Sequence, residues 1–107
     1  MPTLATIPMT IDADAAEFLA EIGQERELEV MLDHARATIP NLSAFHIELH
    51  DFPETGPPSL TIEAYRDPPP EERDGVGREF DRWMGATFPP QVLQNFTLIA
   101  MYHPNER

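Results

Sequence analysis

The residues best suited to chemistry lie in the segment FHIELHDF, residues 45–52, where apolar and polar side chains alternate. In an extended strand, this alternation places His46, Glu48 and His50 on one face. Two imidazoles and a carboxylate on one strand face are able to bind a metal ion or to transfer protons. The alternative is the ordinary solvated face of a half-buried antiparallel strand, where polar residues are expected at every second position.

A second alternating segment, SLTIEAYR at residues 59–66, follows the six turn-forming residues PETGPP. Two alternating segments joined in this way predict a β-hairpin over residues 44–66. The polar face of the hairpin provides the candidate ligand-binding residues, which are His46, Glu48, His50, Glu63 and Tyr65.

The register of this hairpin decides which polar residues meet. Pairing Phe52 near Ser59 sets Glu48 directly opposite Glu63, and two opposed carboxylates destabilise a strand pair unless a proton or a cation lies between them. A slip of the register by two residues would change the partners but keep every side chain on its face.

Strand geometry limits a metal site on this face. Alternate residues of a strand lie roughly 6.5–7 Å apart, so His46 and His50 are too far apart to share one ion unaided. Glu48, His50 and Glu63 are the candidate metal ligands that remain. Because the solvated face explains the same pattern, we predict no bound metal, no cofactor and no catalytic residue.

The composition excludes several chemistries. The chain has neither Cys nor Lys, which excludes thiol nucleophiles, thiolate metal ligands, Schiff-base lysines and P-loop lysines. The two serines, Ser43 and Ser59, do not lie in a G-x-S-x-G nucleophile elbow. The formal net charge of −12 disfavours binding to nucleic acid and to anionic lipid, and it favours a basic protein or a cation as partner.

The length and the apolar pattern indicate one small domain. The 107 residues, 41% of them hydrophobic, suit a single domain over residues 1–107. No run of about 18 apolar residues is present, and the first residues, MPTLATIPMTID, lack the basic and apolar stretches of a signal peptide. We therefore expect a cytoplasmic protein that has no membrane partner.

The first third of the chain predicts a strand followed by two helices. Residues 3–11 alternate as a strand does, but Pro8 cannot donate to a ladder, so this strand must be short, bulged or at an edge. In residues 13–38, the apolar positions before and after Gly23 point in different directions on one helical wheel. The pattern therefore favours two helices, at 13–22 and 25–38, with Gly23 as the stop between them, over a single helix with a kink at Gly23.

The order of elements predicts the fold class. A flexible Pro- and Gly-rich loop at 67–77, a helix through REFDRWMGAT and a last strand NFTLIAMYH follow the hairpin. Strand, helix, strand, strand, helix and strand predict a two-layer α+β fold, with an antiparallel sheet, helices on one face and a ferredoxin-like βαββαβ order. That fold makes the first strand central, and Pro8 is the main objection to it. If the first segment lies outside the sheet, the alternative is a three-stranded αββαβ core.

The last strand is apolar on both faces, with Phe96 and Leu98 on one face and Ile99 and Met101 on the other. A strand of this kind is typically buried on both sides. The second face would be covered by a second copy in a homodimer, by a partner protein, or by the segment FPPQVL.

These features predict a small acidic, non-catalytic interaction or ligand-binding module, of the kind represented by immunity and inhibitor proteins that bind a basic protein. The alternative is a metal-dependent or acid/base enzyme that uses the polar face of the 44–66 hairpin.

Overall fold

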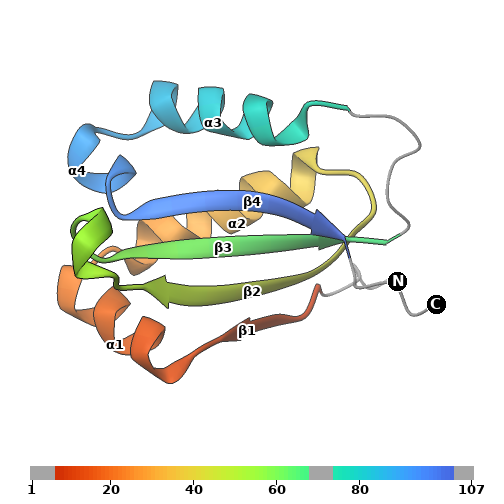
Figure 1. Ribbon diagram of the computed structural model, residues 1–107. Coiled ribbons are helices and arrows are strands. Elements are labelled where there is room, and N and C mark those ends of the chain that lie inside the picture. Colours follow the sequence, from red (N-terminus) through yellow and green to blue (C-terminus); the bar gives the residue numbers. More distant parts are fainter. Residues whose placement is uncertain (1–6, 68–73, 103–107) are drawn as a thin grey trace.

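The computed structural model describes residues 7–67 and 74–102 of the chain. These residues form a four-stranded sheet and four α-helices (Figure 1). In chain order the elements are β1 (Met9–Ile11), α1 (Ala13–Ile22), α2 (Glu25–Thr38), β2 (Leu42–His50), the 3-10 turn η1 (Pro53–Thr55), β3 (Ser59–Arg66), α3 (Val76–Thr87), α4 (Pro90–Leu93) and β4 (Phe96–Tyr102).

The break between α1 and α2 lies at Gly23, and both predicted helix ranges are confirmed. Gly23 has a φ of 67°, in the left-handed region that favours glycine, and its N–H donates to the Leu19 carbonyl at 3.0 Å. The change of direction lets both helices face the same interior. Their buried residues pack in one core and include Ala15, Leu19, Leu28, Met31, Leu32 and Ala35.

The strand order is β1-β2-β3-β4, with β1 at an edge rather than in the centre. Strands β2 and β3 are antiparallel, but β1 pairs parallel with β2 and β3 pairs parallel with β4. The predicted antiparallel, ferredoxin-like sheet is therefore wrong. Both parallel pairs are joined by helices, because a helical crossover returns the chain to the end of the sheet where it started.

The edge position of β1 agrees with the constraint from Pro8. Pro8 precedes the three-residue strand, and its carbonyl accepts a hydrogen bond from the Phe45 N–H at 2.8 Å. Strand β1 does join the sheet, which also excludes the three-stranded alternative. Of the predicted range 3–11, only residues 9–11 are strand, and residues 3–6 lie outside the described residues.

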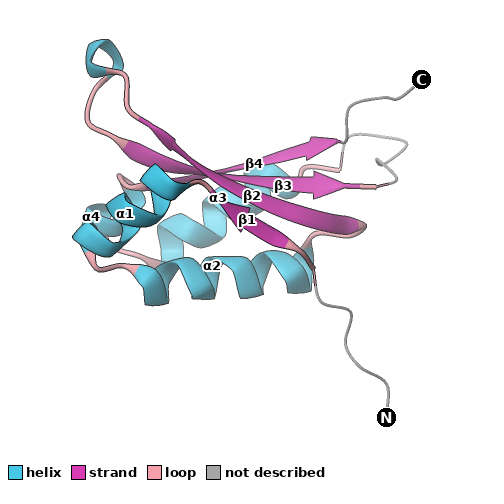
Figure 2. Ribbon diagram, turned by 90° about the horizontal axis from the view of Figure 1, so that it is seen from below, coloured by secondary structure: helices cyan, strands magenta, loops and turns pink. Residues whose placement is uncertain are grey.

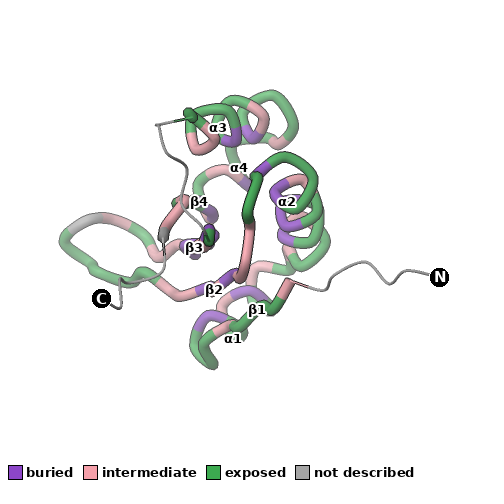
Figure 3. Tube along the Cα trace, turned by 90° about the vertical axis from the view of Figure 1, so that its right-hand side faces the viewer, coloured by how far each residue is buried: buried purple, intermediate pink, exposed green. Residues whose placement is uncertain are grey.

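The helices cover one face of the sheet, so the two-layer α+β class is confirmed (Figure 2). Buried stretches of α2 and α3 lie on the sides that face the strands (Figure 3). On the strands, the interior side chains are Phe45 and Ile47 of β2, Leu60, Ile62 and Ala64 of β3, and Phe96 and Leu98 of β4. We call the opposite side of the sheet the open face.

Strand β4 has one buried side and one open side. Phe96 and Leu98 are buried, whereas Ile99 is 46% exposed. The segment FPPQVL does not cover Ile99, because its Val92 belongs to the core beneath the sheet, where Phe88 and Leu93 also pack. Homodimer formation through the open face is not tested by these contacts and stays a prediction.

The loop predicted at 67–77 ends two residues earlier than expected, at Gly75. Val76 and Gly77 belong to α3, and Gly75 precedes the helix with a φ of 73°. Residues 68–73 lie outside the described residues. Within the described ranges, no helix has the length and apolar character needed to cross a bilayer.

Candidate functional site

The hairpin has its polar side chains on the open face, as predicted, but its register is shifted by two residues. His46 lies opposite Glu63, Glu48 opposite Thr61, and His50 opposite Ser59. The predicted opposition of Glu48 to Glu63 is therefore wrong, although the face of each residue is right. The alternation fixes only the parity of the register, so a shift by two leaves the hydrophobic face unchanged.

A shallow depression of about 410 Å³ lies on the open face where β1, β2 and β3 run side by side. It is lined by Pro8, Thr10, Ala44, Phe45, His46, Glu48, Glu63 and Tyr65. The lining includes four of the five candidate residues of the hairpin. Among the described lining residues, His46 is the only one with a basic side chain, so the depression has an excess of negative charge.

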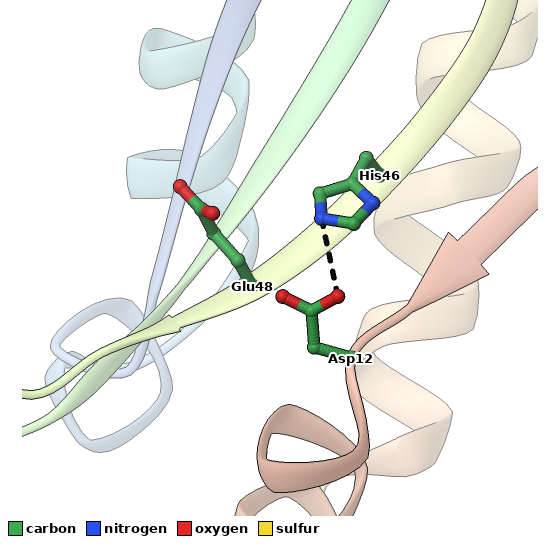
Figure 4. A group of neighbouring side chains, drawn as sticks. All are labelled: Asp12, His46 and Glu48. Carbon is green, nitrogen blue, oxygen red and sulfur yellow. Dashed lines mark ion pairs between the residues drawn. The ribbon is translucent and has the colours of Figure 1, made fainter.

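Both ring nitrogens of His46 have a polar neighbour. Nδ1 lies 2.7 Å from the Thr10 hydroxyl oxygen, and Nε2 lies 3.4 Å from Asp12 Oδ1 (Figure 4). Both partners come from β1 and its end, because the parallel register sets Thr10 beside His46 and Ile11 beside Ile47. The edge strand and the residue that follows it therefore supply the groups beside both ring nitrogens.

Asp12 occupies the N-cap position of α1, as the sequence allows, but its side chain makes no capping hydrogen bond. Its backbone N–H instead donates to the Ile47 carbonyl at 3.1 Å and continues the ladder of β1. An N-cap Asp usually accepts from the first turn of its helix, which contributes about 1 kcal/mol. Here the carboxylate is directed to His46 on the open face (Figure 4).

Two carboxylates of the hairpin interact across the depression. The pKa of Glu48 is raised above its ordinary value, chiefly by burial and secondly by the negative charge of the neighbouring Glu63. Tyr65 donates from its hydroxyl to Glu63 Oε1 at 3.0 Å, and this hydrogen bond to a carboxylate raises the pKa of the phenol. Although the two glutamates are not directly opposed, they lie close enough to compete for the same proton or cation.

His50 is not part of this group. It lies at the exposed end of β2, where its ring meets Phe52 edge-on with centroids 5.2 Å apart. Within the described ranges, the His and carboxylate ligand atoms that converge are those of Asp12, His46 and Glu48, all within 4.8 Å of one another. Of the candidate ligands taken from the sequence, Glu48 belongs to this set, whereas His50 and Glu63 do not.

Asp12 and Thr10 were not predicted as site residues. No local pattern identifies them, because their contact with His46 depends on the parallel pairing of β1 with β2 across the whole α1–α2 crossover. The available signal was indirect: Thr10 alternates with apolar Met9 and Ile11, and Asp12 follows at the strand end.

Compared with known proteins, the chain matches no family model, no curated protein and no solved structure at a significant level.

Proposed function

We propose that this chain is a non-catalytic binding module of the cytoplasm, of immunity or inhibitor type, whose open face binds a basic protein. The observation that carries the proposal is the depression at β1, β2 and β3, in which Glu48 and Glu63 lie near each other and no Arg is among the described lining residues. A guanidinium or ammonium group entering the depression would relieve this repulsion.

Acidic residues also gather away from the open face, at the junction of α1 with the hairpin loop. A second hollow of about 270 Å³ has an apolar floor and a rim of carboxylates. It is lined by Asp14, Glu17, Phe18, Glu21, Leu49, Asp51 and Pro58. An apolar floor with an acidic rim suits the methylene stem and charged head of an Arg or Lys side chain, which supports a basic partner.

The open face also has apolar surface that a partner would cover. Ile99 on β4 is 46% exposed and lies beside Glu63 of β3 in the parallel register. Apolar contact surrounded by charged groups is typical of protein interfaces. A second copy of this chain is the competing occupant, but face-to-face packing of two copies would bring their carboxylates together. Light scattering over a concentration series distinguishes the two, since a monomer mass at high concentration contradicts the dimer.

A catalytic use of the same face is the second candidate. It is favoured by Glu48, because a carboxyl group with a raised pKa holds its proton closer to neutral pH, as a general acid must. Binding is the better-supported role, since the depression is shallow and open and would not exclude water from a reaction.

The proposal is tested by titrating the full chain with a synthetic arginine-rich peptide. The double variant Glu48→Gln, Glu63→Gln removes two charges from the depression and leaves an oxygen to accept from Tyr65. We expect it to weaken binding at least about fivefold, because close charge pairs contribute more than distant ones. The control variant Glu25→Gln, Glu29→Gln removes two charges from exposed positions of α2 and should weaken binding less than about twofold. Equal effects of the two variants would contradict a specific role for the open face.

A further inference from the structure

We propose that Asp12, His46 and Glu48 bind one divalent transition-metal ion, for which zinc is the test ion. The inference stands independently of the basic partner proposed above, because it concerns a small cation and three named donor groups. It replaces the metal ligands suggested by the sequence, since His50 and Glu63 are not among the three converging donors.

The first support is the geometry of the donor atoms. One nitrogen of His46 and one oxygen from each carboxylate lie within 4.8 Å of one another. The separation of His46 Nε2 from Asp12 Oδ1 is 3.4 Å, longer than a strong charge-assisted hydrogen bond. Two ligands of a tetrahedral zinc ion, each about 2.0 Å from the metal, lie about 3.3 Å apart. The pair therefore already has the spacing of two ligands on one ion.

The second support is the contact at the other side of the imidazole. When Nδ1 carries the proton, it donates to the Thr10 hydroxyl at 2.7 Å, and Nε2 presents its lone pair to the carboxylates. Metal-binding histidines commonly donate their second ring N–H to such a partner, which fixes the ring orientation and the tautomer. Thr10 therefore acts as a positioning residue for the proposed ligand atom.

The third support is the position of the two carboxylates. The Asp12 side chain makes no hydrogen bond to the helix that it precedes, and its backbone is fixed by the bond to Ile47. Glu48 projects from the same side of β2 as His46, and one of its oxygens lies within 4.8 Å of the other two donor atoms (Figure 4). Glu63 lies next to Glu48 and adds a further negative charge, so a dication would offset charge that the described lining leaves uncompensated.

The donor set indicates the class of metal. An imidazole nitrogen favours zinc and its neighbours over magnesium and calcium, which prefer ligand sets made entirely of oxygen. Three protein ligands leave room for water in a fourth position. The Asp12 side chain is 48% exposed and that of His46 is 30% exposed, so a hydrated ion can reach both from solvent.

The test uses the full chain without a histidine tag, freed of metal and titrated with zinc against a chromophoric chelator. We expect one zinc per chain, and Asp12→Asn, His46→Gln and Glu48→Gln should each weaken binding at least about tenfold. Thr10→Val should weaken it about tenfold without removing a ligand. The matched control is His50→Gln, which removes a histidine from the same face of the same strand and should change the affinity less than about twofold.

Thermal unfolding in EDTA establishes that each variant folds before its affinity is compared. The ring resonances of His46, followed by NMR during the titration, should shift while those of His50 stay in place. The proposal is overturned by the absence of stoichiometric zinc binding, by unchanged affinity in His46→Gln, or by an equal loss in His50→Gln. Because peptide binding is measured in EDTA and zinc binding without peptide, the failure of one proposal is distinguishable from the failure of the other.

Discussion

The two faces of the sheet differ in whether their charged side chains are paired. On the covered face, Arg66 is 1% exposed, and its guanidinium donates to both Asp74 oxygens, at 3.1 and 2.7 Å, and to the Pro40 carbonyl at 3.0 Å. On the open face, Glu48 and Glu63 share a depression in which His46 is the one basic side chain among the described lining residues. The charge of the first arrangement is paired within the chain, whereas the second has an excess of negative charge that a cation would offset.

This difference separates a structural ion pair from a candidate binding site. A buried cation must be paired, because an uncompensated charge in the interior costs several kcal/mol. Arg66 accordingly joins the turn at Pro40 to the start of α3, where Asp74 also accepts from the Val76 N–H at 3.4 Å. The open-face carboxylates are near water, so the protein tolerates their repulsion and a ligand can relieve it.

The largest effect is expected from Arg66→Met. Removing the guanidinium leaves Asp74 and the Pro40 carbonyl without a charged donor, so the free energy of unfolding should fall by about 2–3 kcal/mol. Urea denaturation measures the loss. The control is Arg82→Met, which removes an exposed arginine paired with Glu79 and should change stability by less than about 0.5 kcal/mol. Similar losses for the two variants would mean that burial does not distinguish Arg66.

A smaller loss is expected from Asp74→Asn, because the amide oxygen can still accept one bond from Arg66. The stability difference between wild type and this variant should also depend on pH. Arg66 holds the pKa of Asp74 below its ordinary value of 3.8. The ionised carboxylate therefore stabilises the fold fully at pH values above 3.8, and this stabilisation is lost as the pH falls through the lowered pKa. The difference in unfolding free energy between wild type and variant should therefore be full at neutral pH and shrink in acid. A difference that is independent of pH would contradict the role of the charge.

The smallest effect, and one of opposite sign, is expected from Glu48→Gln. Removing this charge relieves the repulsion from Glu63, so stability measured in EDTA at pH 7 should rise by roughly a few tenths of a kcal/mol. Glu29→Gln on the exposed side of α2 is the control and should be nearly neutral. If Glu48→Gln destabilised the fold, the open-face carboxylates would be structural, and the contrast between the two faces would disappear.

The sequence predicted what depends on local periodicity. The break at Gly23 followed from helical phase, and the range 59–66 of β3 and the faces of its side chains followed from strict alternation. The order of the strands and the register of the hairpin could not be obtained in this way. A period of two is satisfied equally by registers that differ by two residues, so Glu48 was placed opposite Glu63 instead of Thr61.

The candidate site was predicted in part for the same reason. The polar face of β2 and β3 was predicted from the alternation of their residues. The contribution of β1 was not predicted, because two parallel strands joined through two helices show no short-range sequence pattern that reveals their pairing. Asp12 occupies the N-cap position of α1, but its side chain makes no capping hydrogen bond and lies near His46, a contact that no local sequence pattern indicates.

The shortness of β1 has a consequence for the energetics of the site. A three-residue edge strand has few ladder bonds, so it opens at a lower free energy than the central strands do. When β1 detaches, Thr10 and Asp12 leave His46 while the hairpin can stay folded. The apparent affinity of the open face for a cation that binds Asp12 is therefore scaled by the fraction of molecules in which β1 is docked. Docking of the edge strand and occupancy of the site are then linked equilibria, and amide exchange in β1 reports on both.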